Sequence, residues 1–222
     1  MSEPSRDAPP RGRRPPRPSG DDRELAILAT AERLLAEQPL SAVSVDDLAR
    51  GAGISRPTFY FYFAAKDDVL LTLLDRVVAE ADAAMGRVET ALRRAATGPE
   101  DVPRGLWRQA ISAYADTFRR HRGLTLAWAE ARSTNAEVRA MWATVFEGWV
   151  QRSTAAIEAE RARGAAPPGI PARDLAIVLN SMNERVLYAT LSGDGPAVAE
   201  QDVVDVLLEV WLSAVYGPPR RA

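Results

Sequence analysis

Residues 55–63 read SRPTFYFYF and place five aromatic side chains in a row, a third of the fifteen in the chain. Taken alone, the alternation of Phe and Tyr favours a β-strand, because aromatic residues have high strand propensity. The first residues indicate a helix instead, since Ser55 is a good N-cap and Pro57 falls in the first turn, where its missing N–H costs nothing. On that helix Phe59 and Phe63 share one face, which can close the core of a small helical domain.

The chain before this stretch predicts two more helices. Residues 21–38 begin with acidic residues, have apolar side chains at helical spacing and stop before Pro39. A short helix follows Ser44, where Asp47 makes an approximate capping box, and Gly53 can take the left-handed conformation that ends a helix. Helix, tight turn and helix form the helix-turn-helix unit, whose second helix enters the DNA major groove. An ordinary helical hairpin has the same spacing, so the residues alone leave both interpretations open.

Residues 1–20 differ in composition from the rest, with six prolines, five arginines and almost no apolar side chains. Such a segment cannot bury enough surface to offset its ordering entropy, so we expect a disordered tail. Two roles fit this tail equally well. Its arginines enter a minor groove beside the major-groove site, or they stay solvated.

The rest of the chain has helical periodicity and no strand signals. Further helices are expected over residues 67–85, 104–120, 122–133, 136–163, 172–192 and 200–216. The sequence therefore predicts an all-α protein of about nine helices. A helix-turn-helix domain is expected over residues 21–66, and a larger helical domain over residues 67–222.

Composition excludes several classes of site. The sequence has no Cys, so disulfides, zinc–thiolate centres and Cys nucleophiles are absent. The one His, His121, stands among arginines at a polar helix end, and there is no Gly-x-Ser-x-Gly motif, phosphate loop or metal-spaced cluster. We therefore expect no enzyme, no cofactor and no metal, and an enzyme acting on an apolar substrate is the weaker hypothesis. The lack of a signal-peptide core or membrane-spanning segment predicts a cytoplasmic protein with no membrane partner.

Residues 44–70, SVDDLARGAGISRPTFYFYFAAKDDVL, resemble the helix-turn-helix motif of the TetR family of bacterial transcriptional repressors. The positions that fit the family pattern are Ala49, Gly53, Ser55, Thr58, Phe59, Tyr60, Tyr62, Phe63 and Lys66. From Arg11 to Tyr216 the chain is similar to a member of the family that represses a monooxygenase gene. The resemblance implies a nucleoid-associated repressor that binds a palindromic operator as a homodimer and leaves it when a small molecule binds. It also implies control of a monooxygenase-type gene.

The resemblance further implies which residues touch double-stranded operator DNA. In the family, the recognition helix and the start of the next helix contact bases and phosphates. Carried over to this sequence, the DNA-binding residues are Ser55, Arg56, Thr58, Tyr60, Tyr62 and Lys66. Few of these groups can read base edges, so we expect recognition that depends partly on DNA shape.

Aromatic residues recur at helical spacing in the C-terminal part of the chain, and this spacing alone fits a packed core. Asn180 and Asn183, within an apolar segment, need partners because burying an amide without one is costly. The resemblance implies a long, narrow ligand channel lined by Trp107, Tyr114, Phe118, Trp142, Trp149, Asn180, Asn183, Tyr188 and Trp211. None of these is cationic, so the expected effector is a long, largely uncharged apolar molecule. The alternative is a TetR-type regulator with a filled core and no small-molecule inducer.

In this family the last two helices pair with those of a second subunit. We therefore expect a homodimer that forms through the apolar residues of the segments 172–192 and 200–216. These residues are Leu175, Leu179, Met182, Val186, Val203, Val206, Leu207 and Val210.

Overall fold

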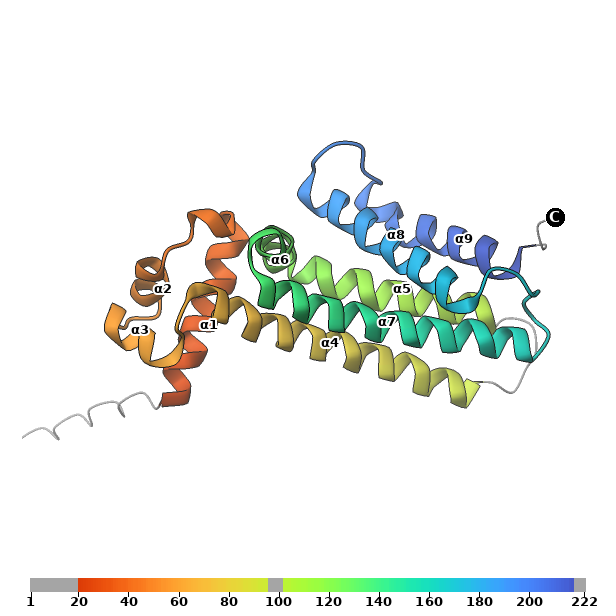
Figure 1. Cartoon of the computed structure of the whole chain (residues 1–222), viewed down its shortest axis with the longest axis horizontal. Coiled ribbons are helices and arrows are strands. Elements are labelled where there is room, and N and C mark those ends of the chain that lie inside the picture. The colour runs from red at the N-terminus through yellow and green to blue at the C-terminus, as the bar shows by residue number, and fades with distance from the viewer. Residues whose placement is uncertain (1–19, 96–101, 218–222) are drawn as a thin grey trace, which may run out of the picture.

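A computed structural model describes residues 20–95 and 102–217 of the chain (Figure 1). All regular elements of this part are helices, nine of them α-helices and two of them short 3-10 turns. The predicted all-α class is therefore confirmed. Residues 1–19, which make up nearly all of the predicted Arg-rich tail, lie outside the described residues.

The α-helices in chain order are α1 (Gly20–Glu37), α2 (Val45–Gly51), α3 (Arg56–Tyr62), α4 (Lys66–Ala95), α5 (Val102–Arg120), α6 (Arg122–Thr134), α7 (Ala136–Ala162), α8 (Ala172–Ser192) and α9 (Val203–Tyr216). The 3-10 turns Leu40–Ala42 and Glu200–Asp202 precede α2 and α9. Figure 1 shows α1, α2 and α3 gathered at one end of the molecule, with α4 running from them along an elongated bundle. In the bundle α8 and α9 lie on the side away from α4.

The helix boundaries follow from the capping residues. Ser44 Oγ accepts the N–H of Asp47 at 3.2 Å, and the Asp47 carboxylate accepts the N–H of Ser44 at 3.2 Å, which completes a capping box at the start of α2. Ser55 Oγ accepts the N–H of Thr58 at 3.3 Å and begins α3. Between the two helices Gly53 has a φ of 67°, the left-handed conformation that other residues rarely adopt. The strand propensity of the aromatic stretch is thus overridden by its cap and by burial.

Phe59 of α3 and Phe63, the residue that ends this helix, are both buried as predicted, at 0% and 6% exposure. They belong to a hydrophobic cluster that also contains Leu28 of α1, Leu70 of α4 and Trp128 of α6. The cluster extends into α4 and α6 because three short helices cannot bury enough apolar surface alone. The core therefore runs across the domain boundary expected at the start of α4, and that boundary stays a prediction.

Close backbone packing joins the first three helices to the bundle. A Cβ atom on Gly123, near the start of α6, would lie 2.2 Å from the carbonyl oxygen of Leu35 in the last turn of α1. Real Cβ atoms do not approach an oxygen so closely, so only glycine allows α6 to lie against α1 in this way. Within the first three helices, Gly51 at the end of α2 allows a close approach to α1, because its Cβ would lie 2.3 Å from Thr30 Cγ2.

A second hydrophobic cluster fills the bundle between α5, α7, α8 and α9. It contains half of the apolar residues expected at the dimer surface, with exposures of 5%, 2%, 2% and 1% for Leu175, Leu179, Val203 and Leu207. For these four residues the expected dimer contact was wrong, because both faces of these helices are apolar and the spacing did not distinguish them. Val206 and Val210 of the same set are exposed, and a dimer interface on these two helices stays a prediction. The large apolar side chains that α8 and α9 do expose are Ile177, Val178, Val206 and Val210.

Phe59 and Phe61 give a matched pair for testing this arrangement of α3. We expect Phe59→Ala to lower the free energy of unfolding by about 3–5 kcal/mol, because it empties a fully buried ring site. Phe61→Ala changes a ring that is 82% exposed, so it should shift the same free energy by less than about 0.5 kcal/mol. Urea denaturation of the two purified variants measures both values. Equal losses would show that α3 does not bury the face described.

Candidate functional site

Two hydroxyl groups lie at the start of α3, the predicted recognition helix. Ser55 Oγ and Thr58 Oγ1 lie 2.8 Å apart, and Ser55 also caps the helix. The helix itself therefore fixes the positions of two of the predicted DNA-contact residues. Side chains that are held in place before binding lose less entropy when they contact a phosphate or a base edge.

Arg56 and Tyr60 form the exposed cationic side of α3. Arg56 Nη1 contacts Asp46 Oδ2 at 3.1 Å, Arg56 Nη2 donates to the Tyr60 hydroxyl at 3.3 Å, and the guanidinium lies 5.8 Å from the centre of the Tyr60 ring. The hydrogen bond to Tyr60 and the charge of Asp46 raise the pKa of Arg56 above its usual value. The pair with Asp46 is exposed, so a DNA phosphate can compete for the guanidinium.

Phe61 of α3 was not among the predicted DNA contacts, although its side chain is exposed. It is 82% exposed, whereas Phe59 and Phe63 on the opposite side are buried. Leaving a Phe ring in water forgoes about 2 kcal/mol of burial, so this position does not serve the stability of the subunit. An apolar ring on a recognition helix suits the C5-methyl group of thymine, which projects into the major groove. Helical spacing could have identified Phe61 as exposed, because it places this ring away from both buried rings.

The remaining predicted DNA contacts, Tyr62 and Lys66, are engaged within the protein. Tyr62 is half-buried against the first hydrophobic cluster, with its hydroxyl beside Gly20 at the start of α1. Lys66 Nζ donates to the carbonyl oxygens of Leu40 and Val43 at 2.9 and 3.0 Å and is partly buried. Lys66 therefore ties the start of α4 to the turn before α2. A phosphate contact through its third N–H stays a prediction.

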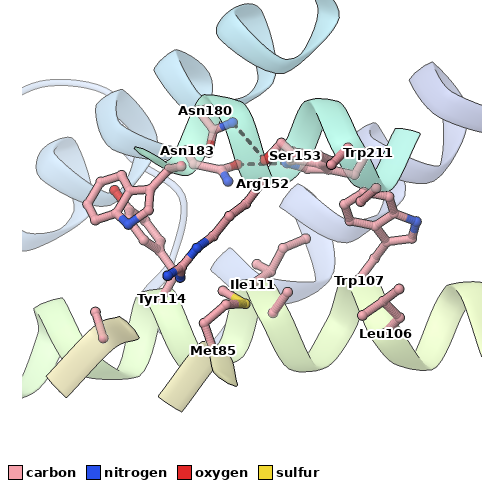
Figure 2. Close-up of a pocket in the computed structure, with 15 residues that line it drawn as sticks. Met85, Leu106, Trp107, Ile111, Tyr114, Arg152, Ser153, Asn180, Asn183 and Trp211 are labelled. Atoms are coloured by element: carbon pink, nitrogen blue, oxygen red, sulfur yellow. Dashed lines mark hydrogen bonds between the residues drawn. The ribbon is translucent and has the colours of Figure 1, made fainter. Parts of the chain in front are cut away.

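A cavity of about 450 Å³ lies in the bundle between α4, α5, α7, α8 and α9 (Figure 2). Its volume is in the range of small-molecule sites, and its walls are mostly apolar. Six residues of the predicted channel line it: Trp107, Tyr114, Trp149, Asn180, Asn183 and Trp211. The prediction missed several others, among them Met85, Leu106, Ile111, Arg152 and Ser153.

Polar groups gather on one wall of the cavity (Figure 2). Asn183 is 6% exposed, and its Oδ1 accepts the indole N–H of Trp211 at 2.9 Å. Asn180 Nδ2 donates to Ser153 Oγ at 3.0 Å and to the Ala176 carbonyl at 2.8 Å. Within the part of the chain that the structure describes, neither Asn183 Nδ2 nor Asn180 Oδ1 has a partner. A guest molecule therefore finds both a donor and an acceptor on this wall.

Three residues of the predicted channel, Phe118, Trp142 and Tyr188, do not line this cavity. The rings of Phe118 and Trp142 meet the ring of Trp149 edge-on, with centroids 5.5 and 5.6 Å away. This packing fills the space beyond Tyr114 and leaves a separate cavity of about 20 Å³, which the three residues line. The expected continuous channel is thus interrupted by Tyr114 and Trp149, and contact of the three with a ligand stays a prediction.

Two partly buried phenols lie at or next to the cavity: Tyr114 lines it, and Tyr216 is hydrogen-bonded to Trp107, which lines it. Burial is the main cause that raises the pKa of Tyr114 and of Tyr216 far above the usual value, so both hydroxyls stay neutral. Tyr216 accepts the indole N–H of Trp107 at 2.9 Å and donates to Glu160 Oε2 at 2.7 Å. This chain of hydrogen bonds fixes the Trp107 ring where it lines the cavity.

Arg152 contradicts the expectation that the ligand site contains no cation, on which the prediction of an uncharged effector depended. The predicted channel contained no cation, but the guanidinium-bearing side chain of Arg152 lines the cavity. Arg152 and Ser153 come three and four residues after Trp149, so they share its face of α7. Helical phase would have placed both residues in the wall once Trp149 was assigned to it.

Residues 20–95 and 102–217 lack the features of two other kinds of site. No helix in these ranges is long and apolar enough to cross a membrane. The same ranges contain no group of three or more His, Cys, Asp or Glu side chains that could hold a metal ion. His121 contacts Glu80 Oε2 at 3.0 Å through Nε2, which connects the junction of α5 and α6 to α4.

Lys66→Met tests the structural part of the role of Lys66. Removing the ammonium leaves the carbonyls of Leu40 and Val43 without their partner, so we expect the free energy of unfolding to fall by about 1–3 kcal/mol. Urea denaturation in the absence of DNA measures this loss. An unchanged midpoint would mean that Lys66 serves DNA binding alone.

Comparison with known proteins places the chain in a family. Residues 27–73 match the family described as bacterial regulatory proteins, tetR family, and residues 107–217 match the family described as transcriptional regulator EthR, C-terminal domain. The chain is 53% identical over 212 residues to the HTH-type transcriptional regulator EthR of Mycobacterium tuberculosis, covering 95% of each chain. It is 46% identical over 208 residues to the protein of the same name from Mycolicibacterium smegmatis, covering 94% of this chain and 93% of that protein.

Solved structures agree on the fold. The fatty acid degradation regulator FadR from Bacillus halodurans superposes with a TM-score of 0.67 at 16% identity, over 90% of this chain and 97% of that one. A TetR transcription regulator from Haloarcula marismortui gives 0.68 at 16% identity, over 88% and 97%. The relatives are transcriptional regulators, which confirms the prediction of a regulator rather than an enzyme. The chain belongs to the TetR family of DNA-binding, dimerising transcriptional regulators and is a repressor of the EthR type.

Proposed function

We propose that this protein is a ligand-responsive repressor that binds a palindromic operator as a homodimer and leaves it when a small molecule with an apolar body enters the bundle cavity. The observation that carries the proposal is the cavity of about 450 Å³ in the same subunit as an exposed recognition helix. Mostly apolar walls with a few polar groups are the pattern of a small-molecule site, which a regulator with a filled core would not have. The proposal includes a monooxygenase-type target gene, on the strength of the sequence resemblance.

Operator binding is assigned to the exposed side of α3. Arg56 and the hydroxyls of Ser55, Thr58 and Tyr60 contact phosphates and base edges, and Phe61 contacts thymine methyl groups. Tyr62 and Lys66 contribute through their positions at the end of α3 and the start of α4. Two such helices in a two-fold dimer read two half-sites about one helical turn of DNA apart.

The second subunit is assigned to the exposed apolar side of α8 and α9. Ile177, Val178, Val206 and Val210 are between 38% and 63% exposed, although they are large aliphatic residues. Four such side chains on adjacent helices match the apolar centre of a homodimer interface. The dimerisation of the TetR family supports a second copy of this chain as the occupant.

The effector acts by favouring a subunit arrangement that does not fit two successive major grooves. The cavity is lined by α4, which also leads directly from the recognition helix. A ligand that fills the cavity can therefore bias the position of α4. The shift in DNA affinity cannot exceed the ligand's preference for the second arrangement.

The DNA assignment predicts that Arg56→Ala weakens binding to the operator by about 1–3 kcal/mol, because one charged contact is lost. The matched control is Arg119→Ala, which removes an exposed arginine of α5, outside the recognition helix. Titration of labelled DNA from the protein's own upstream region measures both affinities, at two salt concentrations. Equal affinity of the two variants would remove Arg56 from the interface.

The effector assignment predicts that a bulky side chain in the cavity blocks the response to ligand. Ala156 lines the cavity, so Ala156→Phe should raise the concentration of methyl decanoate needed to release DNA by at least about tenfold. Ala140→Phe on the exposed part of the same helix is the control and should respond as the unmodified protein does. Release of DNA is read from fluorescence anisotropy. If no compound in a panel of such apolar molecules changes DNA binding, the result would support the alternative of a regulator without a small-molecule inducer.

A further inference from the structure

Arg152 is the charged side chain among the described residues that line the cavity. Figure 2 shows it extending from α7 toward Tyr114 and Met85, with Trp107 and Leu106 at the other end of the pocket. The site therefore has a cationic part and an apolar part that face the same cavity. A molecule that fills it well needs the same two parts.

The guanidinium of Arg152 is held by a single carboxylate. Its Nη1 lies 3.0 Å from Asp82 Oδ1 of α4, and no other partner is present in the ranges that the structure describes. This contact leaves Nε and Nη2 with donors to spare, because a guanidinium has five N–H groups. The side chains of Arg152 and Asp82 are 42% and 45% exposed, so their ion pair is partly solvated and weakly held.

We propose that Arg152 binds a carboxylate group of the effector. The effector is therefore an amphiphilic carboxylic acid whose body is an unbranched, apolar or weakly polar chain. This inference rests on the proposed function of the cavity and adds the chemical class of its ligand. Asp82 does not line the cavity, so the carboxylate of the effector reaches the guanidinium from the cavity side and either displaces Asp82 or shares the guanidinium with it. Arg binds carboxylates in bidentate fashion, and such charge-assisted bonds are among the strongest that a protein offers.

A carboxylate fits this position better than a larger anion. The group that already contacts Arg152 is a carboxylate, so the local geometry accepts one. The cavity offers one cation among apolar walls, whereas a phosphate with two charges needs several cationic or N–H donors. The amides of Asn180 and Asn183 remain for a polar group further along the ligand.

Exchange of the carboxylate at Arg152 also has a consequence for α4. The ion pair between Asp82 and Arg152 connects α4 to α7, and α4 begins next to the recognition helix. When a ligand replaces Asp82, this connection is lost and α4 is free to move relative to α7. The residue that recognises the ligand is thus also a residue that restrains the DNA-binding end of the molecule.

The test compares decanoate with methyl decanoate, which has the same chain without the charge. Binding of each to the full-length protein is measured by calorimetry, together with release of operator DNA. We expect decanoate to bind the unmodified protein at least about tenfold more tightly than the ester. Arg152→Met should abolish this preference while the ester still binds, and Asp82→Asn should strengthen decanoate binding because the competing carboxylate is gone. Arg119→Met, which removes a similarly exposed arginine outside the cavity, should keep the preference.

The possible results separate this inference from the proposed function. If the ester binds and releases DNA while decanoate has no advantage, or if Arg152→Met keeps the advantage, the carboxylate assignment is overturned and the ligand-responsive repressor stands. If neither compound binds at any concentration below its solubility limit, both proposals are contradicted. Circular dichroism of each variant shows whether it is folded, and Arg152→Lys provides a second variant that keeps the charge but loses the bidentate geometry.

Discussion

The packing of Gly123 against the carbonyl of Leu35 is the constraint on which the coupling of the two ends of this protein depends. A side chain at this position would overlap the last turn of α1, so α6 lies directly on the backbone of the DNA-binding end. Lys66 makes a second connection by holding the start of α4 to the turn before α2. With α4 and α6 both attached in this way, the recognition helix cannot be oriented independently of the bundle that contains the cavity.

The cavity combines apolar volume with a small set of polar groups whose hydrogen bonds are only partly used. Trp211 and Ser153 orient the two asparagines, Tyr216 orients Trp107, and Asp82 holds Arg152. Such a site is formed before a ligand arrives, which reduces the entropy lost on binding. The hydrophobic body of a ligand supplies affinity, and the polar groups select its chemistry.

The sequence was sufficient for the parts that depend on local signals. Ser44 and Ser55 marked the starts of α2 and α3, and apolar periodicity placed α5 to α9 within a few residues of their observed bounds. The helix expected to end at residue 85 instead continues to Ala95. Predictions failed where a helix has two apolar faces, or where tertiary packing determines which residues line a cavity or make a contact. The spacing of Leu175 and Leu179 did not distinguish the inner face from the outer one. No local signal showed that the ring of Phe118 packs edge-on against Trp149 instead of lining the cavity. Lys66 forms its hydrogen bonds with residues far away in the chain. Its position in the sequence motif therefore indicated only a DNA contact.

The central claim is that filling the cavity changes the separation of the two recognition helices in the dimer. Because the chain has no Cys, Ala64→Cys places one spin label per subunit on the exposed residue just after α3. Pulsed electron paramagnetic resonance then measures the distance between the labels with operator DNA bound and with saturating methyl decanoate. The account predicts a narrow distribution on DNA and a distinctly different mean distance with the ester. Identical distributions in the two states, with the DNA released, would contradict it.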